Sequence, residues 1–555
     1  MNANPVFSLL ETLSQNQERW RSFTDKQRIG LLKKMYKRAQ SLSFDTWGDL
    51  TCKLSGHDLA TRYGKDQKGF DMLMGANVVI SIIKENIAFF SQSKPKYKMV
   101  RPSKDGRHYY QVHPVQISDQ FKPTRSLRAE VWSLDSLPED DFGGVCLVLG
   151  AGNQPFLAFA DVMYQLFVRK RCCFLKHHPL RKEMHDLFSV LFADIIEEGF
   201  FGCQFFDVKL TNEVIHHDAI TTVHMTGGIH THDNIVWGEK SAQNKAKNEP
   251  VLHKEITSEL GCVTPWMICP EGTWSEAQIQ RHAGQLALAF CFNDSFNCLS
   301  PKVVLLDKNW PQCQEFLDCL RAILAKTPAP SSYYPGAEER YNGFLSAYSD
   351  DAVEVIESPE APKVTDTVSL PWTLVHLDEH NREYAFCNEA FAPILGICLV
   401  ETGNDVGRFL QTCTAICNDE IWGNLSCTIV IDDKTAKRCH FSLDQAIHDL
   451  KYGGIGVNIW TSFLYAFHRC SWGGYPGNPI DNVSSGIGIV NNVYRVPKPE
   501  KSVLYCGFED TNHLTLGFDG RWPFGYTLSR DLVAVLQKPS LANIGKLIWG
   551  QTFGS

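Results

Sequence analysis

The sequence predicts an α/β protein with two doubly wound parallel-sheet domains and a small extended element for contact between subunits. Short apolar runs alternate with helical runs from residue 144 onward, and a second alternating unit begins near residue 263. Such alternation indicates parallel sheets with helices on both faces. A chain of 555 residues is too long for a single core, so two or three domains are expected.

The N-terminal part is predicted to be helical. A helix over 17–42 is indicated by the capping box of Thr24 and Gln27, followed by apolar residues at helical spacing. A second helix is expected over about 70–90. The segment 94–138 is polar and rich in proline, and it is predicted to be extended, as a sheet edge or an oligomer-forming arm.

The two alternating units follow in chain order. The first is predicted to have strands at 145–149, 172–175, 203–208 and 221–225, with helices at 155–168 and 182–198. The second is predicted to have strands at 263–269, 303–306, 373–377, 394–400, 427–431 and 454–458, with helices at 276–290, 312–326 and 443–450. The loop-rich stretch 328–362 is interpreted as a surface insertion. Residues 510–555 receive no functional interpretation.

Composition excludes several classes of function. A net charge of −8 and an isoelectric point near 6.2 argue against nucleic acid as a main partner, because phosphate binding needs a basic surface. No 18-residue apolar run is seen, so no membrane span is predicted. The N-terminus shows no secretory signal. The 19 cysteines follow neither disulfide nor zinc spacing, which favours a reducing, cytoplasmic setting.

Cys298 lies in a predicted loop between a helix and a strand, where a thiol can face a cleft. The segment Asn297-Cys-Leu-Ser-Pro-Lys-Val303 resembles the surroundings of the nucleophilic cysteine in the aldehyde dehydrogenase superfamily. Further pieces of that family's pattern follow in the same order: Gly-Ala-Gly-Asn-Gln-Pro at 150–155, Phe-Leu-Lys at 174–176, Met-Thr-Gly-Gly at 225–228, Glu-Leu-Gly-Cys at 259–262, Glu-Ala-Phe-Ala-Pro at 389–393 and Trp-Gly-Gly at 472–474. The resemblance covers roughly residues 10–510, and it identifies the chain as a divergent member.

The resemblance implies a division into domains. Residues 1–255 would form the cofactor-binding domain, with the extended arm near 95–140. Residues 256–460 would form the catalytic domain that carries Cys298. Residues 461–555 would return to the cofactor domain and supply the oligomerisation element and a C-terminal extension. A homodimer or homotetramer is expected.

The resemblance also assigns three catalytic residues. Cys298 would attack an aldehyde and hold the acyl group as a thioester. Asn153 matches the asparagine whose amide helps to stabilise the oxyanion. Glu259 matches the general base that activates water for hydrolysis. Taken alone, Asn153 also fits a turn residue, and Glu259 also fits a surface glutamate at the start of a strand.

The cofactor implied is NAD or NADP. By resemblance, Lys176 would bind the adenosine ribose, and Thr226, Gly227 and Gly228 would approach the pyrophosphate and nicotinamide. Glu389 and Phe391 would hold the nicotinamide ribose and ring.

The acidic residue common in NAD-selective relatives is replaced by Pro179, so NADP is allowed. His177 or His178 would then lie near a 2′-phosphate; both also fit a solvated loop. No metal is predicted, because His224, His230 and His232 lack the further ligands that a closed site needs.

Some positions depart from the family's pattern. Ser295-Phe296 stand where relatives have Gly-Gln, and Gly228 replaces a common serine. The leading hypothesis is NAD(P)-dependent oxidation of an aldehyde to a carboxylate. Trp460 and Phe463 are among the aromatic residues of a predicted substrate entrance that suits an apolar aldehyde. Two alternatives stay open, which are a coenzyme-A-linked acyl reductase and a catalytically weak nucleotide-binding scaffold.

Overall fold

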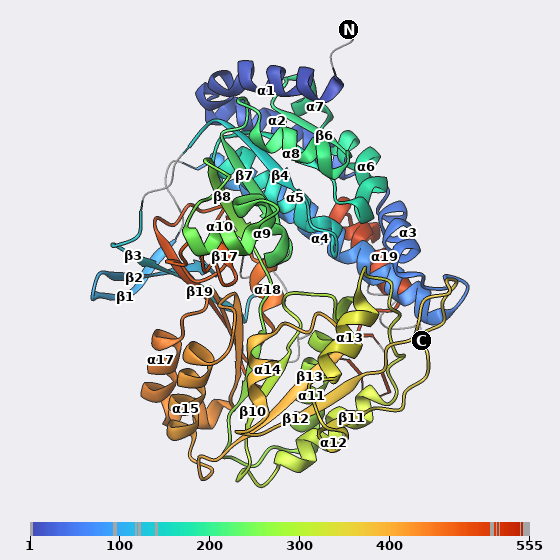
Figure 1. Cartoon of the computed structure of the whole chain (residues 1–555), viewed down its shortest axis with the longest axis vertical. Coiled ribbons are helices and arrows are strands. Elements are labelled where there is room, and N and C mark those ends of the chain that lie inside the picture. The colour runs from blue at the N-terminus through green and yellow to red at the C-terminus, as the bar shows by residue number, and fades with distance from the viewer. Residues whose placement is uncertain are drawn as a thin grey trace.

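The fold is known from a computed structural model that describes residues 4–92, 97–116, 119, 124–138, 142–510, 516–517, 519–520, 522–543 and 546–547. Two large sheets lie one above the other in the long direction of the molecule (Figure 1). Both are dominated by parallel strand pairs and are covered by helices, as the sequence predicts.

The upper sheet has six strands in the order β17-β8-β7-β4-β5-β6. Its strands are β4 (Val145–Leu149), β5 (Cys172–Lys176), β6 (Phe201–Gln204), β7 (Thr222–Thr226), β8 (Glu255–Glu259) and β17 (Gly486–Ile487). All pairs are parallel except that of β17, which runs antiparallel along the outer edge of β8. Its helices are α5 (Pro155–Met163), continued by a π-helical turn (Tyr164–Val168), then α6 (His185–Leu191), α7 (Ala193–Glu197), α8 (Val208–His216), α9 (Ile229–Trp237) and α10 (Ser241–Lys247).

The lower sheet has eleven strands in the order β1-β2-β3-β19-β15-β14-β9-β10-β13-β12-β11. Its parallel part comprises β19 (Pro499–Tyr505), β15 (Gly454–Val457), β14 (Ser426–Val430), β9 (Pro265–Ile268), β10 (Val303–Asp307), β13 (Ile394–Val400) and β12 (Thr373–Leu377), with β11 (Val353–Val355) antiparallel at one edge. Its helices are α11 (Glu276–Cys291), α12 (Cys313–Leu324), α13 (Ala337–Leu345), α14 (Arg382–Cys387), α15 (Val406–Asp419), α16 (Asp433–Arg438), α17 (His440–Asp449) and α18 (Thr461–Ala466).

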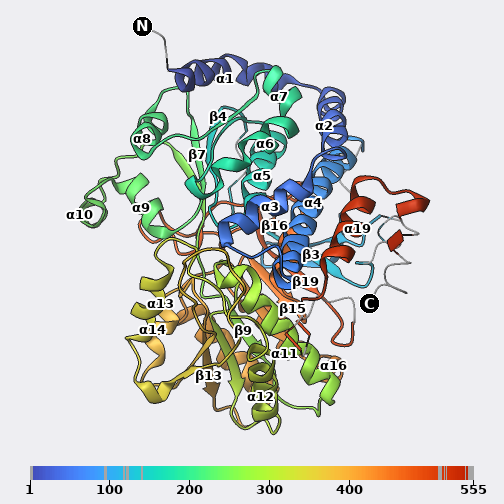
Figure 2. The ribbon, with the colours of Figure 1, turned by 90° about the vertical axis from the view of Figure 1, so that its right-hand side faces the viewer.

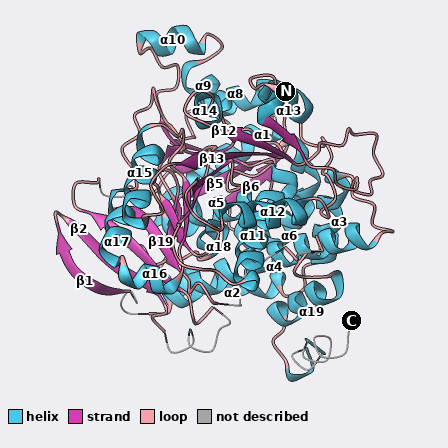
Figure 3. Ribbon diagram, turned by 90° about the horizontal axis from the view of Figure 1, so that it is seen from below, coloured by secondary structure: helices cyan, strands magenta, loops and turns pink. Residues whose placement is uncertain are grey.

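The predicted extended segment forms three antiparallel strands, β1 (Lys98–Lys104), β2 (Arg107–His113) and β3 (Arg128–Leu134). They are continuous with the lower sheet because β3 pairs with β19. Figure 3 shows β1 and β2 projecting beyond the helices. The ends of the predicted arm, near 95 and 140, lie outside the described residues.

Four N-terminal helices cover one side of the molecule: α1 (Pro5–Ser22), α2 (Asp25–Ala39), α3 (Phe44–Ser55) and α4 (Arg62–Phe90). The prediction of a single helix over 17–42 is wrong, since α1 ends before Phe23 and α2 begins after its N-cap Thr24. The capping box that the sequence indicates is present there: Thr24 and Gln27 bond each other's backbone.

Helix α4 is long and apolar enough to cross a membrane by length and composition, and half of its most apolar stretch is buried inside the protein. The late helix α19 (Tyr526–Gln537) lies alongside it (Figure 2). The backbone N–H of Tyr526 donates to the Asp66 carboxylate at 2.9 Å. A Cβ on Gly69 would approach Tyr526 Cα to 2.8 Å. Close packing of this kind is typical of a core helix.

Several sequence-based assignments need correction. Residues 205–208 of the strand predicted over 203–208 are not in a strand, because β6 ends at Gln204, and α8 starts at Val208 because Asp207 caps it. Strand β8 was not predicted, although it carries Glu259. The helix α15 and the central strand β19 were also missed, and the predicted insertion 328–362 contains α13 and β11.

Candidate active site

Cys298 sits on a tight loop that follows α11. Asn293, Asp294 and Ser295 have left-handed φ angles of 52°, 57° and 65°. Such angles are uncommon outside glycine and are best tolerated by Asn and Asp. The Ser295 and Ser300 hydroxyls share a hydrogen bond of 2.9 Å. The Thr264 hydroxyl fixes the loop further by donating to the Cys298 carbonyl at 2.7 Å.

The loop opens onto a cleft of about 500 Å³. Of the predicted site residues, the cleft gathers Asn153, Thr226, Gly227, Gly228, Glu259, Cys298, Glu389 and Phe391. Lys176 does not line it. Residues from both sheets meet here, because Glu259 ends β8 while Cys298 precedes β10.

The Cys298 thiol and the Glu259 carboxylate are in contact. Cys298 Sγ lies 3.8 Å from Glu259 Oε1 and 3.7 Å from Asn297 Oδ1. Glu259 is only 4% exposed, so the interpretation as a surface glutamate is wrong. Burial, and next the nearby Asp161 carboxylate, raise the pKa of Glu259 to about 8. A carboxyl with such a pKa exchanges protons near neutral pH, which suits a general base.

Charges around the thiol act in opposite directions. Burial, and then the carboxylates of Glu259 and Glu389, raise the pKa of Cys298 well above its usual value, while Lys302 lowers it. The Lys302 ammonium is buried and donates to the carbonyls of Asn297 at 3.1 Å and Ser300 at 3.0 Å. It therefore holds the loop and favours the thiolate. Lys302 was not predicted as a functional residue, although it stands within the quoted cysteine segment.

Asn153 lies on the turn between β4 and α5. Its Nδ2 donates to the Phe296 carbonyl at 3.2 Å, and its Oδ1 accepts from the Gln154 backbone at 3.0 Å. The buried Arg181 guanidinium supports the turn by donating to the carbonyls of Gly152 at 2.9 Å and Asn153 at 2.5 Å. The Asn153 side chain thus contacts the Cys298 loop from the turn after β4, and it also stabilises that turn.

The opposite wall of the cleft offers polar groups without protein partners. Glu389 Oε1 is buried and has no hydrogen-bond partner among the described residues, as is true of Nε and Nη2 of Arg340. A Cβ on Gly261 would lie 1.9 Å from Glu389 Oε2, so only glycine admits that carboxylate. A Cβ on Gly228 would meet nothing within 4 Å. Room beside Gly228 and unpartnered polar atoms fit a polar ligand such as a ribose or a phosphate.

Arg340 comes from the segment that the sequence assigned to a surface insertion. Helix α13 carries it over the cleft, where its guanidinium lies 5.8 Å from the rings of Tyr334 and Phe391. Phe296 is fully buried and stacks on Tyr334 at 5.6 Å. Phe296, one of the two residues that differ from the family's Gly-Gln, therefore packs directly on the segment 328–362. Because an insertion has no counterpart in the family's motifs, no sequence pattern pointed to Arg340.

The region after β5 lies outside the cleft. Lys176 is half-buried at the strand's end, and burial lowers the pKa of its ammonium. His177 is 2% exposed, so it is not part of a solvated loop. The half-buried His178 packs over Gly152, where a Cβ would come within 2.6 Å of its ring.

The other sequence candidates are separate from one another. His224 is buried and shares a 2.8 Å hydrogen bond with Thr257, whereas His230 is exposed at the cleft. Trp460 donates to the Leu299 carbonyl at 2.8 Å and is packed in the core. It therefore supports the nucleophile loop from behind and does not line the cleft.

Comparisons with known proteins agree with this architecture. No model of a known protein family matches the chain, and no curated protein matches it either. Among solved structures, succinic semialdehyde dehydrogenase from Streptococcus pyogenes, in complex with NADP+, superposes with a TM-score of 0.61 at 15% identity, over 91% of this chain and 95% of that chain.

Two further structures superpose nearly as well. Lactaldehyde dehydrogenase from Escherichia coli gives a TM-score of 0.60 at 14% identity, over 89% of this chain and 90% of that chain. Glyceraldehyde-3-phosphate dehydrogenase from Methanocaldococcus jannaschii, complexed with NADP, gives 0.59 at 14% identity, over 90% and 93%. The chain therefore has the fold of these aldehyde dehydrogenases, at 14–15% sequence identity to them.

Proposed function

We propose that the chain is an NAD(P)-dependent aldehyde dehydrogenase that oxidises an aldehyde to a carboxylate. The observation that carries this proposal is the contact between the Cys298 thiol and the Glu259 carboxylate in a cleft lined from both domains. A thiol beside a base is the arrangement required for covalent acyl transfer. The fold and the activities of the superposed proteins support the same reaction class.

The first half-reaction uses Cys298 as the nucleophile. Glu259 takes the thiol proton, and the sulfur forms a bond to the aldehyde carbon while the carbonyl oxygen gains a negative charge. The side-chain amide of Asn153 and the backbone N–H of Cys298 stabilise that oxygen, as preorganised donors do in acyl transfer. A bound nicotinamide dinucleotide would accept the hydride from the same carbon. The product held on the enzyme is a thioester.

The second half-reaction needs Glu259 again. Glu259 passes its proton to solvent, then takes a proton from water, whose oxygen attacks the thioester carbon. The bond from carbon to sulfur breaks, and the products are a carboxylic acid and the free Cys298 thiolate. A base with a raised pKa fits both proton transfers.

The residues on the far wall fit a dinucleotide. Glu389 would accept hydrogen bonds from ribose hydroxyls with its unpartnered Oε1, and Phe391 would pack beside the ring. Thr226, Gly227 and Gly228 would border the phosphates, where Gly228 leaves space. Lys176 would bind the adenosine ribose. Both NAD and NADP suit this set.

The chain is further proposed to form a homodimer or homotetramer through the β1–β2 hairpin. Met99 and Val100 on the edge strand β1 are 53% and 39% exposed. Apolar side chains on an uncovered strand edge favour pairing with a second chain. A cytoplasmic location stays a prediction; no disulfide joins any cysteine, and all cysteines lie among the described residues.

An aldehyde panel tests the reaction. Short, long and aromatic aldehydes are supplied with NAD+ or NADP+, with and without coenzyme A, to the wild type, Cys298→Ala and Cys319→Ala. Reduced cofactor should form without coenzyme A in the wild type and in Cys319→Ala, and should be absent in Cys298→Ala. A strict need for coenzyme A would favour the acyl-transferring alternative. Absence of turnover with every substrate would favour the scaffold.

A further inference from the structure

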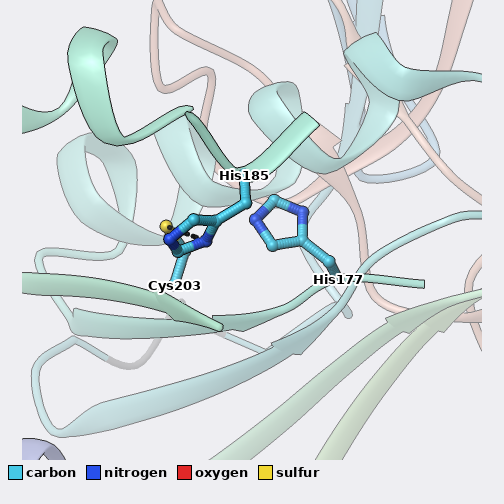
Figure 4. A group of neighbouring side chains, drawn as sticks. All are labelled: His177, His185 and Cys203. Atoms are coloured by element: carbon cyan, nitrogen blue, oxygen red, sulfur yellow. Dashed lines mark hydrogen bonds between the residues drawn. The ribbon is translucent and has the colours of Figure 1, made fainter. Parts of the chain in front are cut away.

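Three side chains with metal-binding donors converge away from the cleft, beneath α6. The donor atoms of His177, His185 and Cys203 all lie within 4.8 Å of one another. In Figure 4 the His177 ring points a nitrogen toward His185, and Cys203 approaches His185 from the strand below. This group takes no part in the proposed aldehyde chemistry.

The sheet geometry brings these residues together. Strands β5 and β6 are parallel, and Leu175 pairs with Cys203. Side chains two residues apart on a strand point to the same face, so the continuation of β5 sets His177 on the face of Cys203. The His177 backbone N–H keeps this register by donating to the Gln204 carbonyl at 2.9 Å. Helix α6 crosses that face and begins at His185.

The spacing suits a tetrahedral ion. Cys203 Sγ and His185 Nδ1 are 3.6 Å apart. Zinc bonds of about 2.3 Å to sulfur and 2.0–2.1 Å to nitrogen, at a tetrahedral angle, place two such donors about 3.5 Å apart. The three donors therefore need only a small contraction to close around one ion.

The buried Nε2 of His177 is a second, independent observation that points to a bound ligand. The residue is 2% exposed, and its Nε2 is buried with no hydrogen-bond partner among the described residues. A buried polar atom without a partner is costly, and native proteins rarely keep one. The edge of its ring packs on Phe188 at 5.2 Å, which fixes the direction of the imidazole.

We propose that His177, His185 and Cys203 bind a divalent ion of the zinc class, with a water molecule as the fourth ligand. Two imidazoles and one thiolate form a donor set that zinc accepts, whereas magnesium and calcium prefer oxygen ligands. The half-buried His185 marks the side from which the ion and the water enter. The ion would join β5, β6 and α6 directly behind Lys176, and so fix the end of β5 where the adenosine part of a dinucleotide would bind.

The protonation state of His177 agrees with this assignment, whereas the Cys203 thiol must lose its proton to the ion. Burial lowers the pKa of His177 to about 4, so its imidazole is neutral at physiological pH and ready to bind a metal. Burial raises the pKa of Cys203 to about 11. Binding therefore releases one proton from the thiol, as it does at other sites where a cysteine ligates zinc.

The test uses the full chain, stripped of metal by a chelator and kept reduced. Zn²⁺ alone is titrated against a competing chromogenic chelator, and Co²⁺ is used as a spectroscopic probe. We expect one tight equivalent of zinc. The cobalt form should show thiolate-to-cobalt charge transfer and the visible bands of tetrahedral geometry. Absence of both signals in the wild type would overturn the proposal.

Four variants locate the ion. Cys203→Ser and His185→Gln should each weaken zinc binding more than about 100-fold, beyond the loss typical of residues that only support a ligand. Cys319 is a half-buried thiol on α12, and Cys319→Ser controls for nonspecific thiol binding. Cys298→Ala controls for binding in the cleft. Both variants should still bind one tight equivalent of zinc.

Retention of tight zinc in Cys203→Ser, or its loss in Cys298→Ala alone, would overturn the proposal. If Cys203→Ser does not fold, the half-buried His185→Gln decides the question by the same criterion. Neither measurement needs aldehyde or dinucleotide, so the result is independent of the proposed dehydrogenase activity.

Discussion

The Cys298 thiol donates a hydrogen bond to the Glu259 carboxylate across 3.8 Å, although 39 residues separate them in the chain. Glu259 ends β8 of one sheet and Cys298 lies in the loop before β10 of the other, so they meet only because the two sheets are packed together. Their contact links the protonation of the proposed nucleophile to that of the proposed base. The expected pH dependence of activity and of stability follows from the buried Glu259 carboxyl in this contact.

The pH dependence of activity should reflect Glu259. Its pKa is raised to about 8, so the carboxylate is lost as the pH falls through 8. We expect kcat/KM to fall about tenfold per pH unit below 7 and to level off above 8. Glu259→Gln should lower kcat about 10²- to 10⁴-fold. An unchanged kcat and pH profile in this variant would show that Glu259 is not the base.

The same variant should make the protein more stable. Between the usual carboxyl pKa and about pH 8, the unfolded chain releases a proton that folded Glu259 retains, so stability falls as the pH rises across this window. Glu259→Gln removes this loss. Thermal unfolding at pH 8 should shift upward by no more than about 2 °C per ~1 kcal/mol, since the shift per kcal/mol becomes smaller as the chain becomes longer. The gain should vanish near pH 4, and a destabilised variant at pH 8 would contradict the buried carboxyl.

Asn153→Ala should lower kcat about 10²- to 10³-fold with little change in KM, because an oxyanion donor acts mainly in the transition state. The chain offers a matched control, since Asn293 also donates to the Phe296 carbonyl, at 2.9 Å. Asn293→Gly keeps the left-handed backbone and removes that amide, together with its hydrogen bond from the Tyr333 hydroxyl at 3.0 Å. If both variants lost kcat equally, the Asn153 amide would act only by holding the loop.

Lys302 should govern the reactivity of the thiol. Its positive charge lowers the pKa of Cys298, so Lys302→Met should slow alkylation of Cys298 about tenfold for each unit of pKa gained. Burial lowers the pKa of Lys302 to about 8, so peptide mapping after iodoacetamide treatment from pH 6.5 to 8, where the ammonium is still charged, measures this rate. The exposed Cys387 is the internal standard, and its rate should not change. Faster labelling of Cys298 in Lys302→Met would reverse the assigned sign.

Arg340 should contribute to binding of the dinucleotide. A charged hydrogen bond is worth about 1.5–3 kcal/mol, so Arg340→Gln should raise the KM for cofactor about tenfold or more. Arg382→Gln is the control, because Arg382 pairs with Glu420 at 2.8 Å, outside the cleft. A higher KM for the aldehyde alone would place Arg340 on the substrate side instead.

Short motifs were enough to find the residues that now surround the cleft. Cys298, Glu259 and Asn153 stand at the ends of strands or in turns, and there local sequence reports the backbone well. The parallel pairing of both sheets followed from the alternation of apolar runs and helices, whereas the order of the strands did not. The motifs were informative because each depends on a few neighbouring residues.

Features that depend on distant packing were not predicted. Strand β19 was missed, since its neighbours β15 and β3 come from remote parts of the chain. Arg340 was missed because only tertiary packing brings α13 over the cleft. The group formed by His177 and Cys203 has no recognisable spacing in sequence, as parallel pairing of β5 and β6 aligns it.

The small strand β17 has a consequence for the synthesis of the protein. Gly486 pairs with Glu259, and a Cβ on Gly486 would lie 2.0 Å from the Ser258 carbonyl, so the late segment fits tightly against the strand that bears the base. A nascent chain on the ribosome lacks this edge until most of the protein has been made. If the proposed function holds, the chain should therefore stay inactive during translation, and chains that terminate before Gly486 should accumulate no aldehyde-dependent activity.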